Sequence, residues 1–102
     1  MKKCIVVTDS GYKYLTEVDG EGRVLLTARK ARSAQWGVIR LSVCVDVAIN
    51  SPSSTRIASV RLAIEDVPED MPKDKMQERL RSMCALAATR NNVDYVIMWE
   101  GE

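Results

Sequence analysis

Five residues between positions 29 and 40 have side chains that could bind nucleic acid. Arg29, Lys30, Arg32 and Arg40 are cations that attract phosphate groups, and Trp36 lies among them, where it could stack on a base. The whole chain has 15 basic and 14 acidic residues, however, whereas domains that bind nucleic acid usually have a strong basic excess. A solvated basic helix face explains the same charges, so nucleic-acid binding by this basic segment is the alternative hypothesis.

A second cluster of charge, the acidic cluster, lies about thirty residues downstream. Its six carboxylates belong to Glu65, Asp66, Glu69, Asp70, Asp74 and Glu78. Such a patch can dock on a basic groove of another protein, because complementary charge speeds association and selects partners. Carboxylates at a helix N-terminus also complement the helix dipole, which explains Asp70 and Asp74 but not Glu65 and Asp66. The acidic cluster is therefore the preferred partner-binding site.

The composition gives little support for an enzymatic activity. The chain has no histidine, which removes the most common proton-transfer group near neutral pH and the most common nitrogen ligand of metals. The three cysteines, Cys4, Cys44 and Cys84, have no metal-site spacing, so we expect reduced and mostly buried thiols. Cys44 is the candidate for reactivity, because a nearby guanidinium such as that of Arg40 would lower its pKa. We expect no catalytic residue, metal ligand or cofactor, and no enzymatic activity.

Alternating apolar residues predict a long central hairpin, which would position several of the charged residues and Cys44. One face of a strand over residues 38–49 contains Ile39, Leu41, Val43, Val45, Val47 and Ile49. The core face of a second strand, over residues 57–67, contains Ala58, Val60, Leu62 and Ile64. Period-two patterns of this length are typical of antiparallel strands with one buried face.

Helical spacing and turn residues predict the remaining elements. A helix over residues 73–89 would pack on the sheet through a stripe that contains Met76, Leu80, Met83, Cys84 and Ala87. Residues 28–35 are rich in good helix formers and predict a short basic helix, with Trp36 buried at its junction with the next strand. Strands over residues 3–8, 12–18 and 23–26 would form a meander, because the sequence Asp-Gly at residues 19–20 favours a hairpin turn.

The sequence thus predicts one α+β domain over residues 1–102. It would contain an antiparallel sheet of five or six strands, one long helix (about 73–89) on one face and a short helix (about 28–35). A last strand over residues 94–99 has apolar side chains on both faces, which is typical of an interior strand or of one covered by a partner. No apolar run reaches the roughly 20 residues of a membrane span, and Asp9 ends the first apolar run too early for a signal peptide, so a cytoplasmic location is expected.

The leading hypothesis is a small, non-enzymatic module that binds another protein. Inhibitors encoded by phages and other mobile elements, including anti-CRISPR proteins, are a class with this size and this lack of motifs. On this hypothesis the acidic cluster contacts the basic, nucleic-acid-handling surface of a host protein. The alternative is a nucleic-acid-binding accessory protein that uses the basic segment. A sheet with one covered face also leaves its other face for a partner, so a homodimer is an open possibility.

Overall fold

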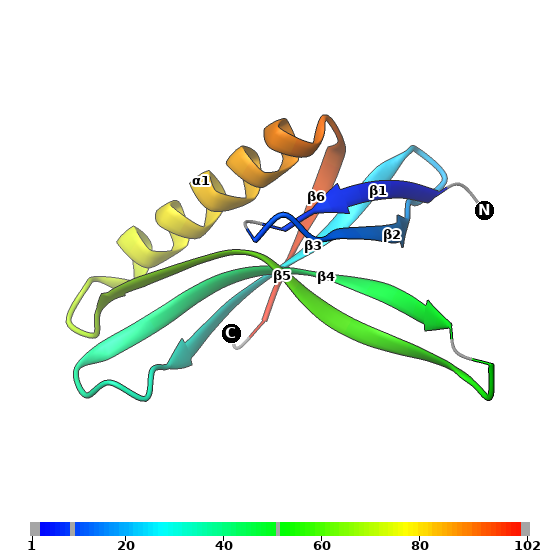
Figure 1. Cartoon of the computed structure of the whole chain (residues 1–102). Helices are drawn as coiled ribbons and strands as arrows, with labels where there is room; N and C mark the ends of the chain where they lie inside the picture. Colours follow the sequence, from blue (N-terminus) through cyan, green and yellow to red (C-terminus); the bar gives the residue numbers. More distant parts are fainter. Residues whose placement is uncertain (1–2, 9, 51, 101–102) are drawn as a thin grey trace.

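A four-stranded sheet with one helix across it forms the body of the structure, a computed structural model that describes residues 3–8, 10–50 and 52–100 (Figure 1). In chain order the elements are β1 (Lys3–Val7), β2 (Lys13–Glu17), β3 (Arg23–Arg32), β4 (Val38–Asn50), β5 (Thr55–Pro68), α1 (Lys73–Asn91) and β6 (Asp94–Trp99). Strands β5, β4, β3 and β6 pair in that order, while β1 and β2 form a separate two-stranded sheet. The face of the four-stranded sheet that lies away from α1 is called the open face below.

The α+β class is confirmed, but the single antiparallel sheet of five or six strands is wrong. Strand β6 pairs with β3 in parallel, because α1 carries the chain back across the sheet before β6 begins. Strand β6 is also an edge strand, not an interior one. In the part of the chain that the structure describes, no helix is long and apolar enough to cross a membrane.

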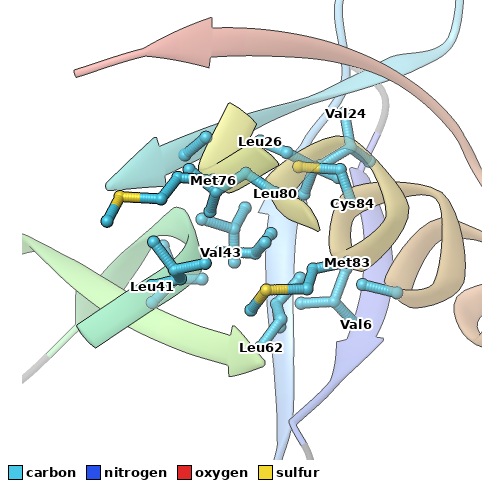
Figure 2. Packing of buried hydrophobic residues seen from close by; sticks show 14 of the residues in the cluster. Val6, Val24, Leu26, Leu41, Val43, Leu62, Met76, Leu80, Met83 and Cys84 are labelled. Atoms are coloured by element: carbon cyan, nitrogen blue, oxygen red, sulfur yellow. The ribbon is translucent and has the colours of Figure 1, made fainter. Parts of the chain in front are cut away.

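The predicted packing of the long helix on the central hairpin is confirmed. The side chains of Leu41, Val43, Val45 and Val47 in β4 are at most 2% exposed. The buried face of α1 contains the predicted stripe, namely Met76, Leu80, Met83, Cys84 and Ala87. The two sets form one cluster, and Figure 2 shows Leu41 and Val43 of β4 beside Met76 and Leu80 of α1. Because burial of each large apolar side chain contributes about 1.5–3 kcal/mol, this contact stabilises the fold strongly.

A β-bulge in β5 makes the prediction that Ile64 lies on the core face wrong. Strand β4 steps from Val43 to Cys44 while β5 steps from Ala63 to Arg61, so Leu62 is an extra residue in the ladder. An extra residue reverses the alternation beyond it. Leu62 remains buried, as expected, but Ile64 is 40% exposed on the open face, and Val67 takes the core position instead.

The short helix predicted over residues 28–35 does not form. Strand β3 continues to Arg32, and a turn over residues 33–37 leads into β4. Six residue pairs join β3 to β4, and they place Ala28 under the helix and Arg29 on the open face. A two-turn helix is marginal by itself, whereas the ladder gives the backbone stable hydrogen-bonded partners. Pairing with a distant strand therefore overrides the local helix propensity.

The predicted N-terminal meander forms only in part. Strands β1 and β2 pair as a hairpin, but β2 does not pair with β3, although the turn at Asp19 is present. The hairpin lies beside α1 and β4 instead. The backbone N–H of Val7 donates to Oδ1 of Asn91 at 2.7 Å, and the hydroxyl of Thr16 donates to the carbonyl of Asp46 at 2.9 Å. These two bonds fix the hairpin between the end of the helix and the outer half of β4.

Replacement of Leu80 by alanine tests the packing of α1. Leu80 is 0% exposed, so Leu80→Ala should lower the free energy of unfolding by about 2–5 kcal/mol in a urea titration. Leu86, which is 60% exposed on the same helix, offers a matched control: Leu86→Ala should change that energy by less than about 0.5 kcal/mol. Equal losses in the two variants would contradict the orientation of the helix.

Candidate functional site

The two charged segments of the sequence meet at one end of the molecule. The turn between β3 and β4 lies beside the loop between β5 and α1, because the backbone N–H of Glu69 donates to the carbonyl of Gly37 at 2.9 Å (Figure 1). Gly37 has φ +76°, a left-handed conformation that glycine adopts without strain and that closes the turn. We call the surface formed by residues 32–40 and 65–79 the charged end.

Most of the acidic cluster is engaged in ion pairs within the chain. The pairs are Glu65 with Arg79 at 3.6 Å, Asp66 with Arg40 at 3.0 Å, Glu69 with Arg32 at 3.8 Å, and Glu78 with Lys75 at 3.9 Å. Among the described residues, no ion pair involves Asp70 or Asp74. The charged end is therefore a mixed surface, in which two unpaired carboxylates stand beside neutralised ones.

The basic segment is divided between the two faces of the sheet. Its residues alternate along β3, so Arg29 shares the open face with Ser42, while Lys30 pairs with the buried Leu41 on the helix side. Arg29 is held on the open face: its guanidinium bonds the carboxylate of Glu100 at 2.8 Å and the hydroxyl of Ser59 at 3.0 Å. The five predicted nucleic-acid-binding residues do not form one continuous stripe.

Trp36 lies at the tip of the turn between β3 and β4, and 92% of its surface is exposed. The prediction that it is buried is wrong, because no helix–strand junction exists there to cover it. The other tryptophan, Trp99, packs on the helix side, where the guanidinium of Arg81 lies 5.3 Å from its ring centre. A fully hydrated tryptophan is unusual in a folded chain, and this residue type is enriched at the centres of protein interfaces.

The ion pair between Arg40 and Asp66 has two hydrogen bonds. Nε of Arg40 donates to Oδ1 of Asp66 at 3.0 Å, and Nη2 donates to Oδ2 at 3.3 Å. These bonds to the guanidinium lower the pKa of the Asp66 carboxyl and raise that of Arg40. Both side chains are about 40% exposed, so solvent screens their attraction. The pair consequently fixes the geometry of the charged end more than it stabilises the fold.

A shallow groove adjoins the acidic residues of the charged end. It has a volume of about 510 Å³ and lies between the β5–α1 loop and the first turns of α1. Its walls combine apolar groups of Pro68 and Met71 with the charged groups of Asp70 and Arg79. A groove of this kind can accept a side chain or a short peptide segment of a partner.

The cysteines are placed where they contribute to packing. All three are free, and Cys44 and Cys84 are at most 1% exposed. Burial raises the pKa of the Cys84 thiol to about 11. The Sγ atom of Cys44 accepts a bond of 3.6 Å from Nη1 of Arg29, so the guanidinium hydrogen-bonded to this thiol is that of Arg29 and not that of Arg40. Within the described ranges no group of three His, Cys, Asp or Glu residues could hold a metal ion.

Comparisons of the chain with models of protein families, with curated proteins and with solved structures find no match. The geometry of the molecule is thus the basis for any functional proposal.

Two features of the charged end were absent from the sequence-based predictions: the exposure of Trp36 and the contact of Glu69 with Gly37. The alternation of Val24, Leu26 and Ala28 was the available signal, because it indicates a strand that continues into the basic segment.

Removal of the Arg40 guanidinium tests the pairing at the charged end. In Arg40→Gln, the carboxyl of Asp66 should titrate at a higher pH than in the wild type, measured by carbon NMR of that carboxyl. In the folded wild type the pKa of Asp66 lies below its unfolded value of about 3.9. The pair therefore stabilises the fold above that pH, and this contribution is lost as the pH falls through the folded pKa.

Arg23→Gln is the matched control, because Arg23 pairs with Asp19 and not with Asp66. It should leave the titration of Asp66 unchanged. If Arg40→Gln also leaves that titration unchanged, the ion pair does not form in solution.

Proposed function

We propose that this chain is a small, non-enzymatic module that binds another protein through the charged end. The observation that carries the proposal is Trp36, 92% exposed on a turn that is hydrogen-bonded to the acidic loop. A tryptophan held on a short, constrained turn loses little conformational entropy on binding and offers a large contact area to a pocket. Charged residues around such an anchor contribute specificity and association rate more than affinity.

The two unpaired carboxylates indicate the charge that the surface of a partner would carry. Asp70 and Asp74 can each accept a cation of the partner without losing an ion pair within the chain, whereas Glu65, Asp66 and Glu69 would first exchange their own. A basic surface that handles nucleic acid is the best match for this arrangement. We therefore retain an inhibitor of a host protein, of the anti-CRISPR or anti-defence type from a phage or mobile element, as the proposed role. Three free cysteines favour a reducing compartment such as the cytoplasm.

The alternative function, direct binding of nucleic acid through the basic segment, has weaker support. Binding of a phosphate backbone needs cations on one continuous surface. Here Arg29 and Lys30 lie on opposite faces of the sheet, and Arg29, Arg32 and Arg40 already pair with carboxylates. Of the five residues of the basic segment, only Trp36 and Lys30 have no carboxylate partner among the described residues.

Truncation of Trp36 tests the proposed surface. In an affinity pull-down from the host lysate, Trp36→Ala should reduce recovery of the specific partner at least about tenfold, because hot-spot tryptophans contribute 2 kcal/mol or more. Its melting temperature should stay within about 2 °C of the wild type, since the side chain is exposed. Leu86→Ala, which removes another exposed apolar group, from α1, is the control and should bind as the wild type. Full recovery with Trp36→Ala would exclude the charged end as the binding surface.

Charge reversal at the two unpaired carboxylates tests the expected chemistry of the partner. Asp70→Lys combined with Asp74→Lys should slow association with the captured partner at least about tenfold at low salt and less at high salt, measured by surface plasmon resonance. The matched control reverses Asp94, an exposed carboxylate at the start of β6. Equal rates for all three proteins would contradict an acidic contact.

Salt-dependent binding to a generic DNA duplex separates the two functions. The proposal predicts that the wild type does not bind the duplex at low salt, measured by fluorescence anisotropy. Tight binding with a steep negative salt slope, lost in Lys30→Ala, would instead support the nucleic-acid alternative.

A further inference from the structure

The open face of the sheet carries a group of apolar side chains that α1 does not cover. The largest of them are Leu15, Leu25, Ile57 and Met98, each between 46% and 68% exposed, and Ile64 adds a fifth at 40%. They come from three strands of the sheet, β3, β5 and β6, and from β2 at its border. Exposed apolar patches on folded chains commonly mark interaction surfaces.

A groove runs through this group because two pairs of strands diverge. Strand β3 pairs with β4 only between Thr27 and Arg32, and its first four residues pair with β6 alone. The half of β4 after Cys44 pairs with β5 alone in the described ranges, so β4 and β5 project together as an arm (Figure 1). The space between arm and sheet has a volume of about 680 Å³, with Leu25 and Val96 on one wall and Ala48 and Ile57 on the other.

The chain exposes more surface than its mass requires. A folded chain of 11.4 kDa typically exposes about 5,800 Å², whereas this chain exposes 6924 Å². Its radius of gyration, 14.4 Å, also exceeds the roughly 13 Å typical of this length. The excess of about 1,100 Å² is of the size that one subunit of a stable dimer buries, about 800 Å².

The charges on the open face are balanced and largely paired within the chain. Arg29 bonds Glu100 at 2.8 Å, Arg40 bonds Asp66 at 3.0 Å, and Arg23, at the border of the groove, bonds Asp19 at 3.0 Å. A nucleic acid or a strongly charged protein therefore finds little net field to attract it. A second copy has a net charge of only +1, so two such faces can approach without strong repulsion.

We propose that the open face is the interface of a homodimer, in which a second copy of this chain covers the exposed apolar side chains. In a two-fold dimer the same patch serves both subunits, so the projecting arm of each copy, with Ile57, lies in the groove of the other. This packing places Leu25, Val96 and Met98 against apolar groups instead of water. It leaves the β3–β4 turn and the β5–α1 loop of each subunit exposed, because these segments lie opposite the tip of the arm (Figure 1). The dimer is independent of the proposed partner and would present two copies of its binding surface.

Sedimentation velocity and light scattering of the purified full chain test this dimer. At about 100 µM the wild type should have twice the 11.4 kDa mass of one chain, and dilution should dissociate it. Ile57→Glu and, separately, Met98→Glu should raise the dissociation constant of the dimer at least about a hundredfold, because each buries an unpaired carboxylate in the interface. Both positions are more than half exposed in the single chain, so each variant should fold, with the circular dichroism of the wild type.

Leu86→Glu is the matched control, since it adds the same charge at an exposed apolar position on α1. It should remain a dimer. A wild type that is monomeric at about 100 µM overturns the proposal, and so does a dimer that Leu86→Glu disrupts while Ile57→Glu and Met98→Glu do not. A wild-type dimer that retains partner binding only when Trp36 is present supports both proposals, whereas a dimer without any partner binding supports this one alone.

Discussion

One extra residue in β5 decides how the charged end is built. Because Leu62 has no opposite residue in β4, the last part of β5 turns its side chains to the faces opposite to those that simple alternation would give. Glu65 consequently lies on the helix side, within 3.6 Å of Arg79, while Asp66 lies on the open face with Arg40. The bulge also moves Ile64 out of the core and Val67 into it. The distribution of carboxylates and apolar groups over the two faces depends on this single insertion.

The charges of this molecule are organised by pairing, although the sequence separates them into blocks. The basic block belongs to β3 and β4, and the acidic block belongs to β5, α1 and the loop between them, so the antiparallel neighbours β4 and β5 bring the blocks together. Arg40 and Asp66 are direct partners in the β4–β5 ladder, and Arg32, the last residue of β3, pairs with Glu69. Segregated charge in a sequence can therefore indicate pairing within the fold as well as a surface for a partner. What distinguishes the charged end is the combination of the exposed Trp36 with two carboxylates, Asp70 and Asp74, that are outside these pairs.

The sequence predicted correctly those elements whose buried face is specified by their own pattern of apolar residues. The alternation in β4 and the helical stripe of α1 each specify a buried face over more than ten residues, and both faces are correct. The errors come from interactions between distant segments. Residues 28–32 have good helix propensity, but their partners in the ladder lie in β4. A period-two pattern does not reveal a bulge, so it predicts Ile64 in the core. The site residues were found as two clusters, but their union at one end required the contact of the β3–β4 turn with the β5–α1 loop.

The central claim is that the partner binds over Trp36, and fluorescence of that residue tests it most directly. In Trp99→Phe, Trp36 is the remaining tryptophan of the chain, and its emission should be that of a hydrated indole, readily quenched by acrylamide. On addition of the partner recovered by pull-down, we predict a shift of the emission to shorter wavelength and strong protection from the quencher. A complex that forms while the quenching of Trp36 stays unchanged would contradict the account.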